Sequence, residues 1–288
     1  MGYAACWRPM QLQLRESNAC ADLEVRRARP LLGTVVEIRA TARTPRKPDP
    51  AFAELEIARL HTAIDTAFNQ VELVHQLMSY QDPDSELSRL NRCEANIPQG
   101  VNPHTYQVLT AAVGFARLSG GAFDPCVASQ FASWEDIELL SGYRVRFKRR
   151  LRIDLGGIAK GYAVDVATQK MQSANVDEIL INAGGDLRVA GTRVHEICLR
   201  HPQAPTVGVN PLQLRNGALA SSGAYFSPAL LEPRTQEPYT GSDAVSVRAG
   251  DCMTADALTK VVLFAPTSIA ERALDECGAE AFVLRAQP

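Results

Sequence analysis

The sequence has little excess charge of either sign and no long apolar run. It carries 30 basic and 32 acidic side chains, which gives a net charge of −2. For the chain as a whole, this balance excludes a strongly basic nucleic-acid binder and an acidic solvating tail. A transmembrane helix needs a run of about 18 apolar residues, and none is present. We therefore expect neither a nucleic-acid partner nor a membrane span.

Paired cysteines are absent as well. The seven cysteines are scattered and form no CxxC pair, so neither a zinc site nor a disulfide framework is predicted. Free thiols are typical of a reducing cytosol. Residues 1–17 are interrupted by Arg8, Pro9 and two glutamines, and they resemble neither a secretory signal nor a lipoprotein leader. These observations predict a cytoplasmic protein.

The composition is that of an ordinary globular protein. The chain has 288 residues, of which 46% are hydrophobic and 22% are charged, so it can bury a sizeable core without disulfides. With only 19 glycines and 17 prolines, neither a collagen-like repeat nor extended disorder is indicated. Residues 1–28 are polar and rich in arginine, and we expect them to form a loose N-terminal arm.

Periodicity and turn residues predict clustered strands and helices in runs. The longest helix is expected over 51–77, where apolar residues recur every three or four positions. Further helices are expected over 103–118, 157–175, 254–266 and 267–278, with a short one beginning near Ser85, and strands over 30–40, 142–157 (as a hairpin or two short strands), 178–191 (strand, turn, strand), 194–200, 217–222, 244–249 and 280–286. This grouping favours an α+β domain over a doubly wound parallel sheet.

Three glycine-rich turns lie between the predicted elements, at 120–124 (GGAFD), 154–161 (DLGGIAKG) and 182–186 (NAGGD). A glycine turn that opens a helix offers backbone N–H groups and the positive end of the helix dipole. The second turn also carries Lys160, a combination that suits a phosphate group. However, GxxxxGK[ST] and GxGxxG are both missing from that segment, so ordinary turn structure remains the alternative for each turn.

Four acidic residues, Asp124, Asp154, Asp186 and Asp256, lie beside these glycines or near a predicted helix start. Such residues commonly cap helix N-termini. They are also the oxygen donors that hold a hard cation next to a phosphate. The residues alone leave both interpretations open.

Taken in order, seven short segments resemble those of the FAD:protein FMN transferase (ApbE) family, from about Arg29 to Leu284. The segments are LLGT (31–34), LMSYQDPDSELSRLN (77–91), GGAFDP (120–125), DLGGIAKGYAVD (154–165), NAGGD (182–186), SSGAY (221–225) and ADAL (255–258). The most specific part of the resemblance is DLGGIAKGYAVD followed by NAGGD. The resemblance implies a T-fold-related α+β domain over 29–288, with mixed, mainly antiparallel sheets flanked by helices.

The resemblance further implies a function and its residues. The chain would bind FAD and, with Mg²⁺, move the FMN half onto a Ser or Thr of a target protein, releasing AMP. Attack on a pyrophosphate depends on positioning and on neutralising the developing charge. Matched position by position, the implied FAD contacts are Leu32, Tyr80, Ala122, Phe123, Asp124, Lys160, Val166 and Leu231; the implied metal ligands are the carbonyl of Ala163, the carboxylate of Asp256 and the side chain at position 260; and the catalytic residues are Asp256 and Lys160. For Tyr80 and Phe123, ordinary core burial is the alternative.

The chain departs from the family pattern in the first of these segments, in a further segment at 229–236 and beside the last of the seven. Leu32 stands where the family commonly has Met. The family's His-x-x-Asp-Pro-x-Thr-Gly reads here as ALLEPRTQ (229–236), so Ala229 replaces the histidine, Glu232 the aspartate and Gln236 the glycine. Losing that histidine removes a candidate general base, a group typically worth about 10²- to 10⁴-fold in rate.

The departure at Lys260 concerns the metal. The family's metal-binding Thr would stand four residues after Asp256, where this chain has Lys260. The neighbouring Thr259 would point about 100° away on the same helix. A lysine can pair with Asp256, but it cannot organise a coordination shell. Three functions therefore stay open: the transferase, an FAD-binding carrier or scaffold, and an FAD pyrophosphatase in which water replaces the protein hydroxyl.

A basic run over 144–152 has two interpretations. On an alternating strand, four of its cations share one face, which is typical of a solvated surface. The alternative is an electropositive rim that steers FAD or an acidic target. Asp22, Glu24 and the acidic segment 134–138 are candidate partners for these cations.

Overall fold

An eight-stranded sheet connects most of the chain in the computed structural model, which describes residues 15–16, 20–45, 48–127, 129, 131–201, 204–223 and 230–285. Its strands, in spatial order, are β1 (Arg15–Glu16), β2 (Cys20–Leu31), β3 (Thr34–Pro45), β7 (Glu178–Ala183), β8 (Asp186–Ala190), β11 (Gly217–Gly223), β12 (Ala244–Ala249) and β13 (Glu280–Leu284). Within the described chain, neighbouring strands of this sheet pair antiparallel. The mixed α/β architecture with antiparallel sheets confirms the expected fold class.

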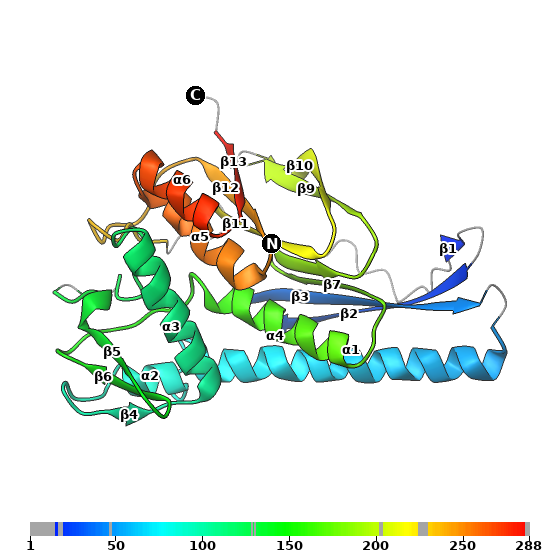
Figure 1. Cartoon of the computed structure of the whole chain (residues 1–288), viewed down its shortest axis with the longest axis horizontal. Coiled ribbons are helices and arrows are strands. Elements are labelled where there is room, and N and C mark those ends of the chain that lie inside the picture. Colours follow the sequence, from blue (N-terminus) through cyan, green and yellow to red (C-terminus); the bar gives the residue numbers. More distant parts are fainter. Residues whose placement is uncertain are drawn as a thin grey trace, which may run out of the picture.

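Helices cover one face of this sheet (Figure 1). The helices α1 (Pro50–Met78), α4 (Ala159–Ser173), α5 (Cys252–Phe264) and α6 (Thr267–Glu276) follow the sheet from β2 to β13. The predicted apolar period of α1 is confirmed, because Leu60, Ile64, Phe68, Val71 and Val74 are all buried. These residues form the main core together with the inward-facing side chains of β3 and β7.

The opposite face of the sheet is covered in part by a hairpin of β9 (His195–His201) and β10 (Ala204–Leu214). Alternation along β7 sends Ile179 and Ile181 into the helix-covered core and Leu180 into a second, smaller one. That small core contains Leu199 and Leu214 from the hairpin. Asp186 and Ala190 are four residues apart on β8, so their side chains point to the same face of the sheet. Because Ala190 packs in the helix-covered core, Asp186 also points toward the helices.

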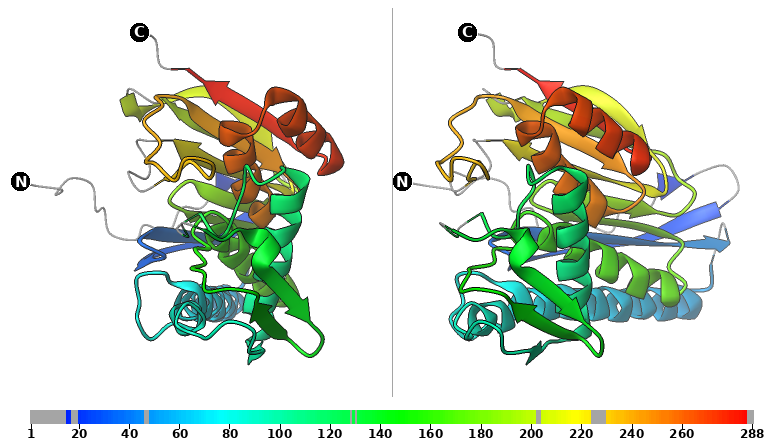
Figure 2. Two further views of the ribbon diagram at one scale, coloured as in Figure 1. Left: turned by 90° about the vertical axis from the view of Figure 1, so that its left-hand side faces the viewer. Right: turned by 60° about the vertical axis from the view of Figure 1, so that its left-hand side comes forward.

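A smaller unit lies at one end of the molecule, beside α1 and α5 (Figure 2). It consists of α2 (Glu86–Leu90), α3 (Pro103–Leu118), the short 3-10 helix η1 (Trp134–Asp136) and a sheet of β4 (Gln99–Gly100), β6 (Arg144–Phe147) and β5 (Ile137–Leu140). Asn102 caps α3 by accepting a hydrogen bond from the His104 amide at 2.9 Å, as the Asn-Pro start predicts.

The prediction of a loose arm is wrong for residues 15–16, which form β1, and for residues 20–28, and the expected boundary after residue 28 falls inside β2. This strand pairs with β3 along its whole length. Two of its arginines are held by contacts with α1: Arg27 and Arg29 both pair with Asp65 and lie over the ring of Phe68. Side chains with charged ends concealed the strand from a pattern that counts apolar residues. The rest of the expected arm, 1–14 and 17–19, lies outside the described residues.

Three further predictions of strands were wrong or incomplete. The expected single strand over 30–40 is a hairpin, because Leu32 and Gly33 have φ values of 56° and 70° and reverse the chain between β2 and β3. Within 142–157 only β6 forms, and its partner β5 was not predicted. Strand β10 was also missed.

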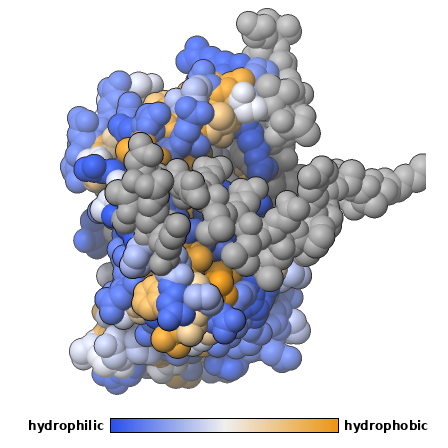
Figure 3. Space-filling view, turned by 90° about the vertical axis from the view of Figure 1, so that its right-hand side faces the viewer, coloured by the Kyte–Doolittle hydropathy of each residue, from blue (hydrophilic) through white to orange (hydrophobic). Residues whose placement is uncertain are grey.

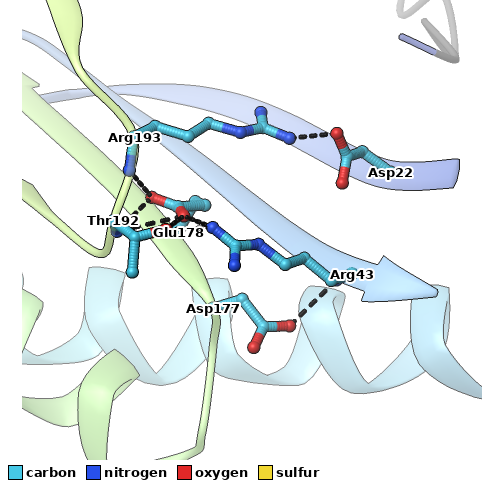
Figure 4. Close-up of polar contacts among 6 residues, drawn as sticks. All are labelled: Asp22, Arg43, Asp177, Glu178, Thr192 and Arg193. Carbon is cyan, nitrogen blue, oxygen red and sulfur yellow. Dashed lines mark hydrogen bonds and ion pairs between the residues drawn. The ribbon is translucent and has the colours of Figure 1, made fainter. Parts of the chain in front are cut away.

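A buried carboxylate fastens the far end of the β2–β3 ribbon to the loop after β8 (Figure 4). Glu178 accepts hydrogen bonds from the amides of Thr192 and Arg193, and it pairs with Arg43. Burial alone would raise the pKa of Glu178, but these N–H donors hold it below its ordinary value. Arg193 in turn pairs with Asp22, which is therefore not a partner of the basic run.

The basic run over 144–152 pairs instead with the acidic segment beside it. Arg146 pairs with Glu138, Arg149 Nε lies 2.9 Å from Asp136 Oδ1, and Lys148 donates to the carbonyl of Glu135 at 2.9 Å. These contacts favour the solvated-face interpretation.

The end of the molecule at which α1 begins is largely hydrophilic, with a small group of apolar side chains low in the view of Figure 3. On the first turns of α1, Phe52 and Leu55 are exposed. Isolated apolar residues of this kind are common on protein surfaces.

In the described part of the chain, no helix combines the length and the apolar character needed to cross a bilayer, and five cysteines are free thiols.

Helices α4 and α5 approach closely at Gly161, where a Cβ would lie 2.8 Å from the Cα of Met253. We expect Gly161→Ala to destabilise the fold by roughly 1–3 kcal/mol, because the two helices would have to separate. Gly114→Ala, at an exposed helix position with open space around it, should instead stabilise by roughly 0.5–1 kcal/mol. Urea unfolding of both variants measures the contrast. Equal effects would show that the α4–α5 contact is looser than described.

Candidate functional site

The start of α5 is fixed by two aspartates. Asp251 is its N-cap and accepts a hydrogen bond from the Thr254 amide at 2.8 Å. Asp165, on α4, accepts from the amides of Cys252 at 2.9 Å and Met253 at 2.8 Å. Asp165 is itself held by Arg188 at 2.6 Å. These bonds fix where α5 lies along α4. As a result, the next helical turn of α5 faces the glycine-rich turn that precedes α4.

Four charged residues meet where α4, α5 and β8 come together, and we call Lys160, Asp186, Asp256 and Lys260 the charge cluster. Lys160 pairs with Asp186, and Lys260 pairs with Asp256. Lys260 Nζ also donates to the backbone carbonyl of Asp256 at 3.1 Å. The side chains of the two aspartates are 1% and 0% exposed, that of Lys260 is 11% and that of Lys160 is 32%. Lys160 is thus the member that a ligand can reach.

Backbone amides complete the pairing of both carboxylates. Gly161 N donates to Asp256 Oδ2 at 3.1 Å, and Ser221 N donates to Asp186 Oδ1 at 3.3 Å. Each carboxylate therefore receives an ammonium on one oxygen and an amide on the other. A buried carboxylate without such donors would be strongly destabilising.

The pKa values follow from this arrangement. Burial would lower the pKa of Lys160, but the Asp186 and Asp256 carboxylates raise it well above its ordinary value. Burial would raise the pKa of Asp256, but Lys260 and Lys160 hold it below the ordinary range. For Asp186, burial and the neighbouring Asp256 raise the pKa. The charged state that we assign to the cluster is two ammonium groups facing two carboxylates.

The glycine turn packs directly on Lys260. A Cβ added to Gly157 would lie 3.3 Å from Phe123 Cε2 and 3.5 Å from Lys260 Cε. The turn before α4, the Phe123 ring and the stem of Lys260 are therefore neighbours, and glycine at 157 leaves room for both side chains. The glycine-rich turns 120–124 and 154–161 meet here, and the third, 182–186, joins them through the Asp186–Lys160 pair.

The four aspartates singled out in the sequence have different roles. None of them is the N-cap residue of a described helix, but Asp256 accepts a hydrogen bond from the Gly161 amide in the first turn of α4. Asp186 and Asp256 belong to the charge cluster. Asp154 accepts from the Gly156 amide at 2.8 Å, and Asp124 accepts from the Cys126 amide at 2.7 Å, so both hold turns. Burial raises the pKa of each of these two turn-forming carboxyls. Helix α4 has no side-chain cap.

Burial separates the two aromatic candidates. Tyr80 is 38% exposed in the segment after α1, so the alternative of core burial is wrong for it. Phe123 is buried in the main core and packs edge-on against Phe115; its contact with FAD stays a prediction. Neighbouring Ala122 is fully buried.

The remaining candidates are spread around the site. Ala163 is buried on α4 and Val166 is half-buried there, while Leu32 occupies the β2–β3 turn. Leu231 forms an isolated bridge with Pro238. The Thr259 hydroxyl donates to the Asp256 carbonyl, which also accepts from Lys260 Nζ, and it lies 2.7 Å from the Ser222 hydroxyl.

The segment that replaces the family's histidine motif is described only from residue 230, so Ala229 lies outside the described residues. Gln236 has a φ of 60°, a conformation that suits the family's glycine better. Its backbone amide donates to the Glu232 carbonyl at 2.7 Å, and its side chain reaches the carbonyl of Ser129 at 2.5 Å.

Comparison with known proteins places this arrangement in a family. A model of the ApbE family matches residues 32–283. The chain belongs to the ApbE family. Among its ApbE relatives, the FAD:protein FMN transferase of Treponema pallidum is 24% identical over 82% of this chain and 77% of its own length. That of Vibrio cholerae is 26% identical over 80% of this chain and 78% of its own.

Solved ApbE structures share the fold. The ApbE protein of Thermotoga maritima superposes with a TM-score of 0.76 at 26% identity, covering 90% of this chain and 94% of that one. The flavin transferase ApbE of Vibrio cholerae gives a TM-score of 0.71 at 22% identity, covering 90% and 93%. The fold expected from the ApbE-like motifs is confirmed.

Two positioning residues of this ApbE site were missed in the sequence. Asp165 ends the motif DLGGIAKGYAVD, and Arg188 lies two residues after NAGGD. Their ion pair joins α4 to β8 and fixes the start of α5. Asp165 could have been found as an acidic residue inside a glycine-rich motif. Its partner Arg188 could not, because it lies on another element and spacing along the chain does not reveal the pair.

The Lys260–Asp256 pair gives a stability prediction. Lys260→Met leaves a buried carboxylate without its cation, and we expect the free energy of unfolding at pH 7 to fall by about 3–5 kcal/mol. The double variant Asp256→Asn/Lys260→Met should recover part of that loss. Lys170→Met, at an exposed position of α4, serves as the control and should change little.

The loss should depend on pH in a defined direction. In the native protein the pKa of Asp256 lies below its ordinary value of 3.8, so its stabilising contribution is complete above that value and disappears as pH falls through the folded-state pKa. In Lys260→Met the lone carboxyl ceases to be costly once it is protonated. The difference between the two proteins should therefore shrink below about pH 4. Denaturant unfolding between pH 3 and 7 measures it, and a constant difference would contradict the pairing.

Proposed function

We propose that this chain binds FAD and transfers its FMN half to a Ser or Thr hydroxyl of a target protein, releasing AMP. The supporting observation is that the glycine turn before α4 packs on the charge cluster, in a member of a family whose named relatives are FAD:protein FMN transferases. The FAD contacts inferred at Leu32, Tyr80, Ala122, Phe123, Asp124, Lys160, Val166 and Leu231 remain predictions, as do the cytoplasmic location and the Ser/Thr motif of the target.

Lys160 is the residue best placed to meet phosphate. Its ammonium has three N–H donors, and Asp186 occupies one of them. The raised pKa keeps it charged at neutral pH. Attack on a pyrophosphate concentrates negative charge on phosphoryl oxygens, and a fixed cation stabilises that charge. Lys160 would therefore bind FAD and lower the barrier to transfer.

The charge cluster offers no ready general base. Both oxygens of Asp256 and both oxygens of Asp186 already accept hydrogen bonds. A carboxylate engaged in this way is a poor acceptor for the proton of an incoming hydroxyl. This favours, as a second candidate, the FAD-binding carrier that retains the cofactor site without efficient transfer.

The residues present do not fit the Mg²⁺ ion that the family implies. The expected ligands were the Ala163 carbonyl, the Asp256 carboxylate and position 260, but Lys260 directs its ammonium at the Asp256 carboxylate and carbonyl. Among the described residues, no group of three or more His, Cys, Asp or Glu side chains could hold a metal. We therefore derive no step through Mg²⁺.

Flavin affinity tests the cofactor part of the proposal. We expect the purified protein to bind FAD more tightly than FMN, because the adenylate half adds contacts. Lys160→Gln should weaken FAD binding about 10- to 100-fold through the lost charged hydrogen bond. Lys170→Gln, on the exposed side of the same helix, should bind like the native protein. Calorimetry measures all three, and equal affinity for the two flavins would contradict an FAD site.

Product analysis separates the three candidate functions. The protein is incubated with FAD and a peptide carrying the family's Ser/Thr acceptor motif, and the products are weighed by mass spectrometry. Transfer predicts flavinylated peptide and AMP in equal amounts. AMP and free FMN with unmodified peptide would indicate a pyrophosphatase, and intact FAD bound to protein would indicate a carrier. We expect the first result, at a rate reduced about 10²- to 10⁴-fold relative to a family member that has the histidine.

A further inference from the structure

Lys260 is held in place from several sides. Its ammonium contacts the Asp256 carboxylate and carbonyl, and its stem lies against the turn at Gly157, beside Phe123. Only 11% of its side chain is exposed. With its stem packed on the turn that opens α4 and its ammonium bonded to two oxygens of Asp256, Lys260 is a resident part of the site.

The charges around Asp256 are balanced by this lysine. The cluster has two ammonium groups and two carboxylates, and the next carboxylate along α4, Asp165, has Arg188 as its own partner. The buried thiol of Cys252 adds no charge, because burial raises its pKa well above the ordinary value. Without Lys260 the same cluster would carry one excess negative charge beside the backbone carbonyl of Asp256.

We propose that the Lys260 ammonium takes the place of a divalent cation at Asp256, so that this chain's cofactor site works without Mg²⁺. Mg²⁺ requires several oxygen ligands in near-octahedral geometry. Lys260 occupies one carboxylate oxygen of Asp256 and the Gly161 amide occupies the other. The charge of Lys260 also repels a second cation at contact distance. The identity of the cofactor in this proposal rests on the proposed function. The cation site does not, because Mg²⁺ binding there can be tested without FAD.

The proposal divides the work of the two lysines. Lys260 neutralises Asp256 from within and stays largely out of solvent. Lys160, which is three times more exposed, is the cation that a phosphate group can approach. A substitution that removes the charge of Lys260 while adding an oxygen ligand should convert the site from self-neutralised to metal-binding.

The experiment measures thermal unfolding of FAD-free protein with increasing Mg²⁺, and in parallel with EDTA. The native protein should show no specific rise in melting temperature. Lys260→Thr should become stabilised, by about 3 °C at Mg²⁺ ten times above its Kd. Asp256→Asn/Lys260→Thr lacks the carboxylate and should not respond. Lys170→Thr controls for the loss of a surface lysine and should behave as the native protein.

Two outcomes would overturn the proposal: a Mg²⁺-dependent rise in the native protein that Asp256→Asn abolishes, or a folded Lys260→Thr that gains no response. If Lys260→Thr does not fold, the native protein alone decides. Its FAD affinity, measured by calorimetry in EDTA and in 10 mM Mg²⁺, should differ less than about twofold, whereas a tenfold gain with Mg²⁺ would refute the proposal. Absence of FAD binding in both conditions would refute the proposed function instead and leave the cation result, which is measured without FAD, unaffected.

Discussion

The ion pair between Lys260 and Asp256 constrains everything built around it, because a fully buried carboxylate is stable only with its partners in place. Gly161 must present its amide to the second oxygen of Asp256, which fixes how closely α4 and α5 approach. Gly157 must leave room for the lysine stem. The Asp165–Arg188 pair then holds α5 at the corresponding height. The charge cluster and the packing contact between α4 and α5 are thus one structure.

The same pair separates the packing role of Asp256 from any catalytic role. Asp256 needs a neutralising charge in this chain because its side chain is fully buried. A lysine within the helix supplies that charge permanently, whereas a metal ion would supply it only while bound. Under the proposed function, the packing around Asp256 would therefore be kept whether or not the protein transfers FMN, and the more exposed Lys160 would be the cation that faces phosphate.

Local sequence patterns predicted a helix or strand reliably where the residues that stabilise it lie within that same element. The period of α1 and the Asn-Pro start of α3 predicted both helices closely, because helix burial and capping are decided within a few residues. Strand β2 was missed because its arginines are stabilised by Phe68 and Asp65, on α1. Strand β10 was missed because its pairing with β9 creates a second core that is not apparent from either strand alone.

The sequence by itself determined the class of fold, the family and the order of the motifs, since these depend on residues close together along the chain. It also marked Lys260 as a neighbour of Asp256, because positions four apart share a helix face. Only the tertiary structure decided that Asp186 pairs with Lys160, that Tyr80 is exposed while Phe123 is buried, and that Gly157 lies against both Phe123 and Lys260. Such contacts join residues from 26 to more than 100 positions apart, and their partners are selected by the packing of α4 and α5 on the sheet.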